Sequence, residues 1–476
     1  MHDIAKIEKD KISNITDDNF KYQSGSIKAT IKGIYYNHSF FQNTDDIPSG
    51  KSFGIILDRT NFYAEQGGQQ YDTGFITIDT ADAQAEFEVK NVQVFAGYVL
   101  HIGRLIYGRF AVENEAVASY NEPRRKLLMN NHTATHILNY ALREVLGNSI
   151  DQKGSLVAPE KLRFDFSLKK GVTNDELAHV ELISNEFIKK NKVVYSKDVP
   201  LAVAKAIHGL RAVFGEVYPD PVRVVSLGYD VNDIVQDVSN PKWGDTSIEF
   251  CGGTHVAKTG DIKNFVILEE SGIAKGIRRI VAVTGEEAQQ ASKVADEFKI
   301  KINNISKLQG AELDSALKQV SKELDASDIS SLKKSEYRET LNELRKAFND
   351  SDRARKAAQT KEVIDVINNY FEKNPNSPYI IKLLNVGSNT KTNLKDKAAY
   401  LFSVDETSSR VAHSCIVGKP LVDKGLKAAD WAKAVSESVG GKSGGKDDAA
   451  QGSGTNVNEI DNALRVAEQF ANLQLN

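Results

Sequence analysis

The sequence predicts a multidomain protein of the α+β class. Its 476 residues exceed what one hydrophobic core usually supports, and about 100 to 200 residues per domain predicts three or four packed units. Strand-like runs fill the start of the chain and return in two later parts, with helical periodicity between them. The apolar share of 41% and the charged share of 26% are typical of globular proteins. We expect a β-barrel-like domain over 1–120, an α+β domain over 121–285, a helical arm over 286–378 and an α/β globular domain over 379–476.

The first two units follow from a change of periodicity. Short β-rich runs separated by turn residues between 25 and 120 are typical of a small β-barrel or sandwich. From Arg124 to Leu146 the apolar positions recur with helical spacing, and Gly147 follows as a stop signal. Strand-like runs then alternate with one helix up to residue 285. This mixture predicts an α+β domain that shares a core with the first helix.

The last two units differ in their strand content. Between 286 and 371 strand signals fade, and apolar residues recur at mixed steps on a charged background, which predicts a helical arm. The irregular spacing lacks the sustained heptads of a coiled coil, which weakens a reading as a self-associating scaffold. After a turn at 374–378, strand-like runs, a helix at 427–438, a Gly-rich loop and a last helix at 459–473 predict a compact α/β domain.

Composition says more about the cellular compartment of the protein than about its binding partner. The residues after Met1 do not form a secretion signal, and no apolar run approaches the roughly 20 residues that span a bilayer. We therefore expect a cytoplasmic protein without membrane contact. Cys251 and Cys415 are the only cysteines, too few for a disulfide framework. The net charge of −3 neither suggests nor excludes RNA.

Four residues form a candidate metal site. His132 and His136 lie four apart on the predicted helix, so both imidazoles project from one face. Cys251 and His255 belong to CGGTH, whose glycines allow a tight turn that brings thiolate and imidazole together. Three histidines and one cysteine suit zinc better than magnesium or calcium, which prefer oxygen ligands.

Each half of this site is weak by itself. An isolated pair of histidines at this spacing is more often part of an ordinary helix face, and an isolated Cys-x-x-x-His is common. Their occurrence within one apparent domain favours a joint zinc site. Four protein ligands would close a tetrahedral structural site, whereas a catalytic zinc keeps a position for water or substrate, and the sequence leaves both readings open.

Several segments, taken in order, resemble a known family. HTATH and three further motifs resemble the editing domain of alanyl-tRNA synthetases and of their free-standing editing relatives: SLVAPEKLRFDFS (155–167), SIEFCGGTHVAKTGDI (247–262) and SGIAKGIRRIVAVTG (271–285). FYAEQGGQQYDTG (62–74) resembles the loop of the preceding β-domain, in the form found in eukaryotic cytosolic enzymes. The Gly-rich stretch 438–454 is similar to a loop of that family's C-terminal domain, which helps to hold tRNA.

The resemblance implies hydrolytic editing of mischarged alanine tRNA, chiefly the seryl and also the glycyl ester. The zinc would polarise the ester carbonyl, lower the pKa of a bound water or anchor the substrate's amino group. The family also carries a class II aminoacylation domain, which we expect this chain to lack. It would then be the C-terminal part of an alanine-tRNA ligase or a stand-alone deacylase.

The same resemblance implies residue roles. Carried over by motif, the catalytic pocket residues are Gln69, Thr135, Asp261 and Arg278, and the substrate-binding residues are Gly67, Gly68, Lys442 and Lys446. A hydroxyl or amide aimed at the seryl side chain suits discrimination by hydrogen bonding. Each of these positions also has a plain reading as a turn, helix, strand or surface residue.

Two other functions remain open at this stage. The main alternative is a noncatalytic tRNA-binding module with a structural zinc, which the count of four ligands permits. The other is a scaffold that self-associates. Homodimerisation through the last domain also remains open.

Overall fold

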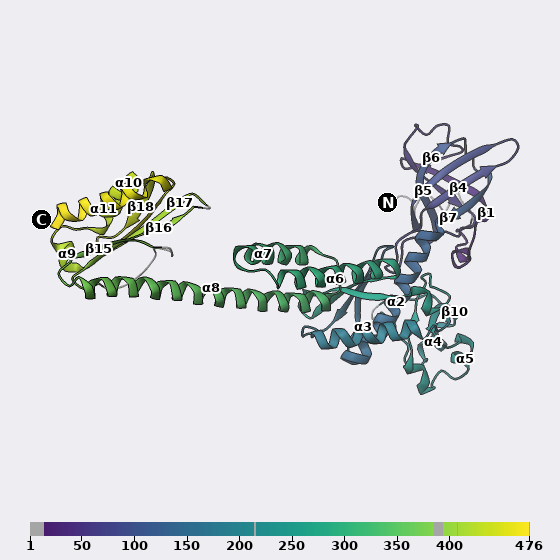
Figure 1. Cartoon of the computed structure of the whole chain (residues 1–476). Coiled ribbons are helices and arrows are strands. Elements are labelled where there is room, and N and C mark those ends of the chain that lie inside the picture. The colour runs from purple at the N-terminus through teal and green to yellow at the C-terminus, as the bar shows by residue number, and fades with distance from the viewer. Residues whose placement is uncertain (1–13, 214–215, 385–393, 407, 476) are drawn as a thin grey trace. The chain divides into compact units, whose positions relative to one another are not determined.

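The computed structural model describes residues 14–213, 216–384, 394–406 and 408–475 (Figure 1). The chain divides into two compact units. One unit runs to Lys307 and includes Lys318–Leu341, and the other comprises Leu308–Leu317 and the chain from Asn342 onward. The candidate metal ligands all lie in the first unit. No helix among the described residues is long and apolar enough to span a bilayer.

A closed β-barrel forms the first part of the first unit. Its strands pair in the order β1, β3, β6, β5, β4 and β7, and β7 pairs back with β1. Apolar side chains alternate inward along these strands and fill the barrel with residues such as Phe53, Phe87 and Phe110. The barrel predicted from the sequence is therefore confirmed, with bounds β1 Ile27–Tyr36, β3 Ser52–Leu57, β4 Gly74–Asp79, β5 Gln84–Phe95, β6 Tyr98–Tyr107 and β7 Glu115–Tyr120, and a short β2 Ser39–Phe41 beside β1.

Helix α2 (Glu122–Leu146) follows the barrel directly. It begins at Asn121, whose side chain accepts a hydrogen bond from the Arg124 N–H, and it ends before Gly147, which has a φ of 93°. Leu138 and Leu142 lie on its buried face. α2 packs with α3 (Asn174–Lys189) against an antiparallel sheet of order β13-β14-β9-β8, with bounds β8 Gln152–Val157, β9 Leu162–Ser167, β13 Phe265–Ala274 and β14 Ile277–Thr284.

A smaller sheet places the second half of the metal site. It has the order β10-β11-β12 and packs its own core around Trp243 together with two short helices. Cys251 follows the last residue of β12 directly. The bounds are β10 Val194–Val199, β11 Val222–Leu227, β12 Ile248–Phe250, α4 Leu201–Lys205 and α5 Val231–Gln236.

Three helices occupy the stretch that was predicted to be a helical arm: α6 Gly285–Ile305, α7 Gly310–Ala326 and α8 Ser331–Lys373. Within the first unit, the Tyr337 hydroxyl at the start of α8 donates to the Ala295 carbonyl of α6. The predicted helical character of this stretch is confirmed.

The second unit contains a five-stranded sheet of order β15-β16-β17-β19-β18. β15 is parallel to β16, and the other pairs are antiparallel. α10 and α11 cover it around the buried Trp431, as expected for an α/β domain. The bounds are β15 Tyr379–Leu384, β16 Ala398–Asp405, β17 Arg410–Val417, β18 Gly441–Gly445, β19 Ala449–Gly454, α9 Lys419–Asp423, α10 Ala428–Ser438 and α11 Ile460–Leu475.

The predicted Gly-rich loop is instead a β-hairpin. β18 and β19 pair along their whole length, from Gly441 with Gly454 to Gly445 with Ala450. A Cβ atom on Gly441 would lie only 1.9 Å from the carbonyl oxygen of Ser453. The glycines therefore serve close backbone approach between paired strands rather than a flexible loop.

Candidate metal centre and cavity

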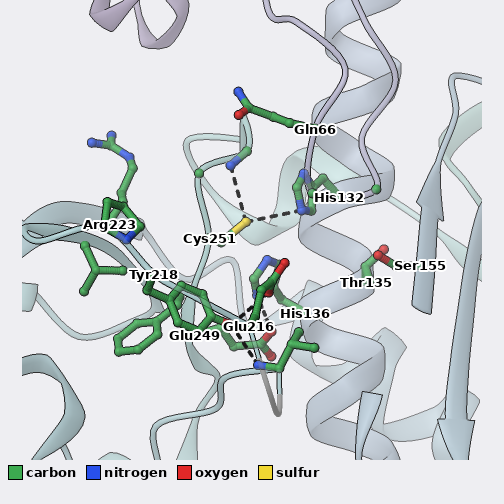
Figure 2. A pocket seen from close by; sticks show the side chains of 18 of the residues that line it. Gln66, His132, Thr135, His136, Ser155, Glu216, Tyr218, Arg223, Glu249 and Cys251 are labelled. Atoms are coloured by element: carbon green, nitrogen blue, oxygen red, sulfur yellow. Dashed lines mark hydrogen bonds and ion pairs between the residues drawn. The ribbon is translucent and has the colours of Figure 1, made fainter. Parts of the chain in front are cut away.

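The four predicted ligands lie together. One donor atom from each of His132, His136, Cys251 and His255 lies within 4.8 Å of the other three. The histidines of α2 project from the same buried face, and Figure 2 shows His132 beside the sulfur of Cys251. The i, i+4 spacing on a helix and the turn after β12 thus converge on one point.

Distances within the cluster fit zinc. Cys251 Sγ lies 3.3 Å from His132 Nε2 and 3.4 Å from His255 Nε2. A tetrahedral zinc with ordinary Zn–N and Zn–S bonds separates its N and S ligands by about 3.5 Å. A Cβ atom on Gly253 would lie 2.0 Å from Cε1 of His132, so only glycine fits there. The four residues could therefore hold a metal ion, and their donor set and spacing are consistent with zinc.

Charge in the cluster also suits a cation. Burial raises the pKa of the Cys251 thiol, but the three imidazoles, led by His132, lower that pKa well below its usual value. Burial lowers the pKa of His255 to about 4, against the opposing effect of Cys251. These shifts favour the thiolate of Cys251 and the neutral imidazole of His255, which are the forms that bind metal.

Glu249 supplies a second negative charge. Its Oε2 lies 3.0 Å from His136 Nδ1 as an ion pair. The geometry at Nδ1 does not fit a hydrogen bond. Burial lowers the pKa of His136, but Glu249 and Cys251 raise it to about 10. Asn139 and Ser247 both donate to the other carboxylate oxygen at 2.9 Å. Glu249 is thus a fixed, buried anion beside the cluster.

A cavity of about 770 Å³ opens against three of the four ligands: His132, His136 and Cys251 line it, and His255 does not. Gly67 and Gly68 of the barrel loop and Thr135 of α2 complete part of its wall. Figure 2 shows Thr135 between His136 and Ser155, with Gln66 near His132. This volume is typical of a small-molecule or cofactor-sized site.

The other predicted pocket residues lie elsewhere. Gln69 is fully buried behind His132, with Oε1 2.7 Å from its Nδ1. Asp261 accepts a hydrogen bond from the Lys258 N–H within the 3-10 turn η4 (Thr259–Ile262). Arg278 forms two hydrogen bonds of 2.6 Å with Glu270. None of the three is among the residues that line the described cavity.

Thr135 lines the cavity, and its hydroxyl group already donates one hydrogen bond. The hydroxyl donates to the Asn131 carbonyl of its own helix at 2.8 Å, so its oxygen keeps acceptor capacity. Lys442 and Lys446 lie in the second unit, where both are exposed on the β18–β19 hairpin.

The structure adds residues that the sequence analysis missed. Tyr22 lines the cavity, and its hydroxyl donates to the Gly252 carbonyl at 3.0 Å. The guanidinium of Arg223 lies 3.7 Å from the centre of the Tyr22 ring. Gln152 also lines the wall. Of these residues and Glu249, only Glu249 carried a signal, as an acidic residue between the apolar Ile248 and Phe250 just before CGGTH.

Four family models match separate parts of the chain. The model described as "tRNA synthetases class II (A)" matches residues 2–124, and "Threonyl and Alanyl tRNA synthetase second additional domain" matches 222–281. "Alanine--tRNA ligase domain" matches 288–351, and "DHHA1 domain" matches 382–473. With the fold and the site, these matches define the class as class II aminoacyl-tRNA synthetases.

Curated relatives narrow the class to one family. The alanine--tRNA ligase of Candida albicans is 49% identical over 98% of this chain and 48% of its own length. The mitochondrial alanine--tRNA ligase of Saccharomyces cerevisiae is 46% identical over 99% of this chain and 48% of its own length. The cytoplasmic alanine--tRNA ligase of Drosophila melanogaster is 40% identical over 100% of this chain and 50% of its own length. The chain belongs to the alanyl-tRNA synthetase family and corresponds to its C-terminal region. It spans about half the length of these relatives.

One solved structure is also similar. The C-Ala domain from Aquifex aeolicus alanyl-tRNA synthetase matches 20% of this chain and 92% of its own, at 15% identity. The TM-score of 0.18 is too low to support a fold assignment.

Proposed function

We propose that this chain hydrolyses mischarged alanine tRNA, removing serine and glycine from the tRNA end with the help of one zinc ion. The observation that carries this proposal is the juxtaposition of a zinc-competent cluster with an open cavity, since His132, His136 and Cys251 all border the space in which a substrate would lie. A structural zinc needs no such cavity. The proposal does not include alanine activation.

Different residues of the chain would bind the metal ion and the substrate. His132, His136, Cys251 and His255 would hold the ion, which when bound would polarise the ester carbonyl or anchor the substrate's amino group. The unbound acceptor capacity of Thr135 would receive the hydroxyl of a seryl group. An alanyl group offers no such donor, so it would be retained on its tRNA.

Two glycines would admit the terminal nucleoside. Gly67 and Gly68 have φ values of 57° and 85°, and a Cβ atom on Gly68 would lie 2.4 Å from Ser155 Oγ. The loop therefore presents bare backbone to the cavity, where N–H and carbonyl groups can pair with a base or ribose. Arg223, which also lines the cavity, would meet a phosphate.

The predictions for the second unit remain proposals. We expect Lys442 and Lys446 to contact the backbone of alanine tRNA, because both are exposed cations on a narrow hairpin. Homodimerisation through this unit and a cytoplasmic location are likewise proposed. The similar relatives carry both cytoplasmic and mitochondrial names.

The competing function is a noncatalytic tRNA-binding module with a structural zinc. The four-residue donor set favours it, because four protein ligands fill a tetrahedral zinc. The two functions separate in one assay, in which purified protein is mixed with serine-charged alanine tRNA and released serine is measured, with alanine-charged tRNA as control. Selective release of serine supports the deacylase. Binding of both tRNAs by folded, zinc-loaded protein without release supports the module.

A further inference from the structure

One contact joins the barrel to the metal cluster. Gln69 lies in the loop between β3 and β4, and its side chain is completely buried. Its Oε1 lies 2.7 Å from His132 Nδ1 and accepts a hydrogen bond from the Thr254 N–H at 3.0 Å, while its Nε2 donates to Thr254 Oγ1 at 2.9 Å. One amide from the barrel thus contacts both halves of the cluster, on α2 and in the CGGTH turn.

The chemistry of these partners fixes the amide's orientation. The backbone N–H of Thr254 can only donate, so the Gln69 atom that faces it must be the carbonyl oxygen. The same oxygen faces His132 Nδ1, which must therefore carry the proton. His132 Nε2 is then left with a free lone pair, and it is the atom that lies 3.3 Å from Cys251 Sγ. Gln69 selects the tautomer that can bind metal.

The other two histidines are held from within their own domain. Thr133 Oγ1 lies 3.1 Å from His255 Nδ1, and Glu249 contacts His136 Nδ1. Both partners belong to the α+β domain that also supplies the ligands. Gln69 differs because it comes from the barrel, 63 positions before His132 in the sequence.

The loop that carries Gln69 is itself docked on the α+β domain. The Gln70 N–H donates to the Val157 carbonyl at 3.0 Å, and the Val157 N–H donates to the Gly68 carbonyl at 2.7 Å. These bonds join the loop to the end of β8. Movement of the loop away from β8 would withdraw the amide from His132.

We infer that the β-barrel is a working part of the zinc site: Gln69 acts as a positioning residue that fixes the imidazole of His132, and metal retention is coupled to the docked barrel loop. This role differs from the pocket role that the sequence resemblance implied for Gln69. It concerns metal affinity and does not depend on the proposed deacylase function.

Zinc affinity of the full chain tests the inference. Apo-protein is titrated against a chromophoric zinc chelator for the wild type, Gln69→Leu, Gln69→Glu and Glu65→Gln. Loss of a partner of this kind typically weakens metal binding about 10- to 100-fold, and we expect that loss for Gln69→Leu. Gln69→Glu keeps an acceptor for His132 and Thr254 and should bind zinc nearly as tightly as the wild type. Glu65→Gln changes an exposed side chain in the same loop and should leave zinc affinity unaltered.

Three results would overturn the inference: unchanged zinc affinity in Gln69→Leu, equal weakening in Glu65→Gln, or a failure of Gln69→Glu to restore binding. Long-range ¹⁵N–¹H spectra of the zinc-loaded wild type give an answer that needs no variant. They should show a proton on His132 Nδ1 and none on Nε2, and the opposite tautomer would contradict the geometry.

Discussion

Arg125 of α2 and Asp72 of the barrel form a buried ion pair, in which Arg125 Nε lies 2.9 Å from each carboxylate oxygen. The remaining guanidinium donors reach the carbonyls of Lys21 and Asn61. The arginine lies seven residues before His132 on the same helix. This pair therefore ties the helix that carries two of the candidate metal ligands to the loop that carries Gln69.

Removing the carboxylate should destabilise the first unit strongly. Asp72→Ala leaves a guanidinium buried without its counter-charge, and breaking such a pair costs about 3–5 kcal/mol. The exposed pair Arg109–Asp45 is the matched control, and Asp45→Ala should cost under about 1 kcal/mol. Urea unfolding of the three proteins measures both values. Similar stabilities for the two variants would show that the buried pair does not tie these elements together.

Thr135→Val tests the source of serine selectivity. Valine keeps the shape of threonine but removes the oxygen that would accept the seryl hydroxyl. We expect hydrolysis of seryl-tRNA to fall about 10- to 100-fold, with a smaller change for glycyl-tRNA, which carries no hydroxyl. Single-turnover rates on both tRNAs measure the ratio. An equal fall for both substrates would mean that Thr135 does not read the side chain.

Cys251→Ala should abolish stoichiometric zinc without unfolding the protein. The thiolate is the donor that both His132 Nε2 and His255 Nε2 face, and its loss leaves three imidazoles. The variant with the buried cysteine of the second unit, Cys415→Ala, should keep its zinc. Elemental analysis after dialysis decides between them, with circular dichroism as the check on folding. A Cys251→Ala protein that retains one zinc would place the metal elsewhere.

Acid should loosen the barrel through His101. Burial lowers the pKa of His101 to about 4, whereas the pKa of a histidine in the unfolded chain is about 6.5. Between these two pH values the unfolded chain binds a proton that the folded barrel does not. The contribution of neutral His101 to stability is therefore complete above pH 6.5 and is lost as the pH falls toward 4. The difference corresponds to roughly 3 kcal/mol.

Hydrogen exchange of the β3 and β6 amides, corrected for intrinsic rates, reports this change locally. Protection should fall between pH 6.5 and 5 in the wild type and in His38→Gln, which alters an exposed histidine. His101→Gln should show a weaker pH dependence. Protection that is independent of pH in the wild type would mean that the barrel does not exclude the proton.

Local spacing in the sequence was enough to predict that these four residues lie together. His132 with His136 and Cys251 with His255 each lie within one helical turn or one tight turn, so their geometry follows from short-range rules. The barrel was also predictable, because strand periodicity and turn residues are local signals. The hairpin at β18 was not, since its glycines read as a loop until the paired backbone is seen.

Contacts across long stretches of chain escaped prediction. The contact of Gln69 with Thr254 spans 185 positions, and that of Tyr22 with Gly252 spans 230. Motif resemblance marked Gln69 as functional, but a motif does not say which way a side chain points, so its contacts with His132 and Thr254 could not be predicted. The pairing of Arg278 with Glu270, eight positions away on the neighbouring strand β13, is a short-range contact of the kind that the sequence allows.

The most direct test of the account is to add zinc back to chelated protein in measured amounts while following serine release from serine-charged alanine tRNA. The account predicts negligible release by the apo-protein and a rate that rises with added zinc to a plateau at one equivalent. Apo-protein that releases serine as fast as zinc-loaded protein, or zinc-loaded protein that releases none, would contradict it.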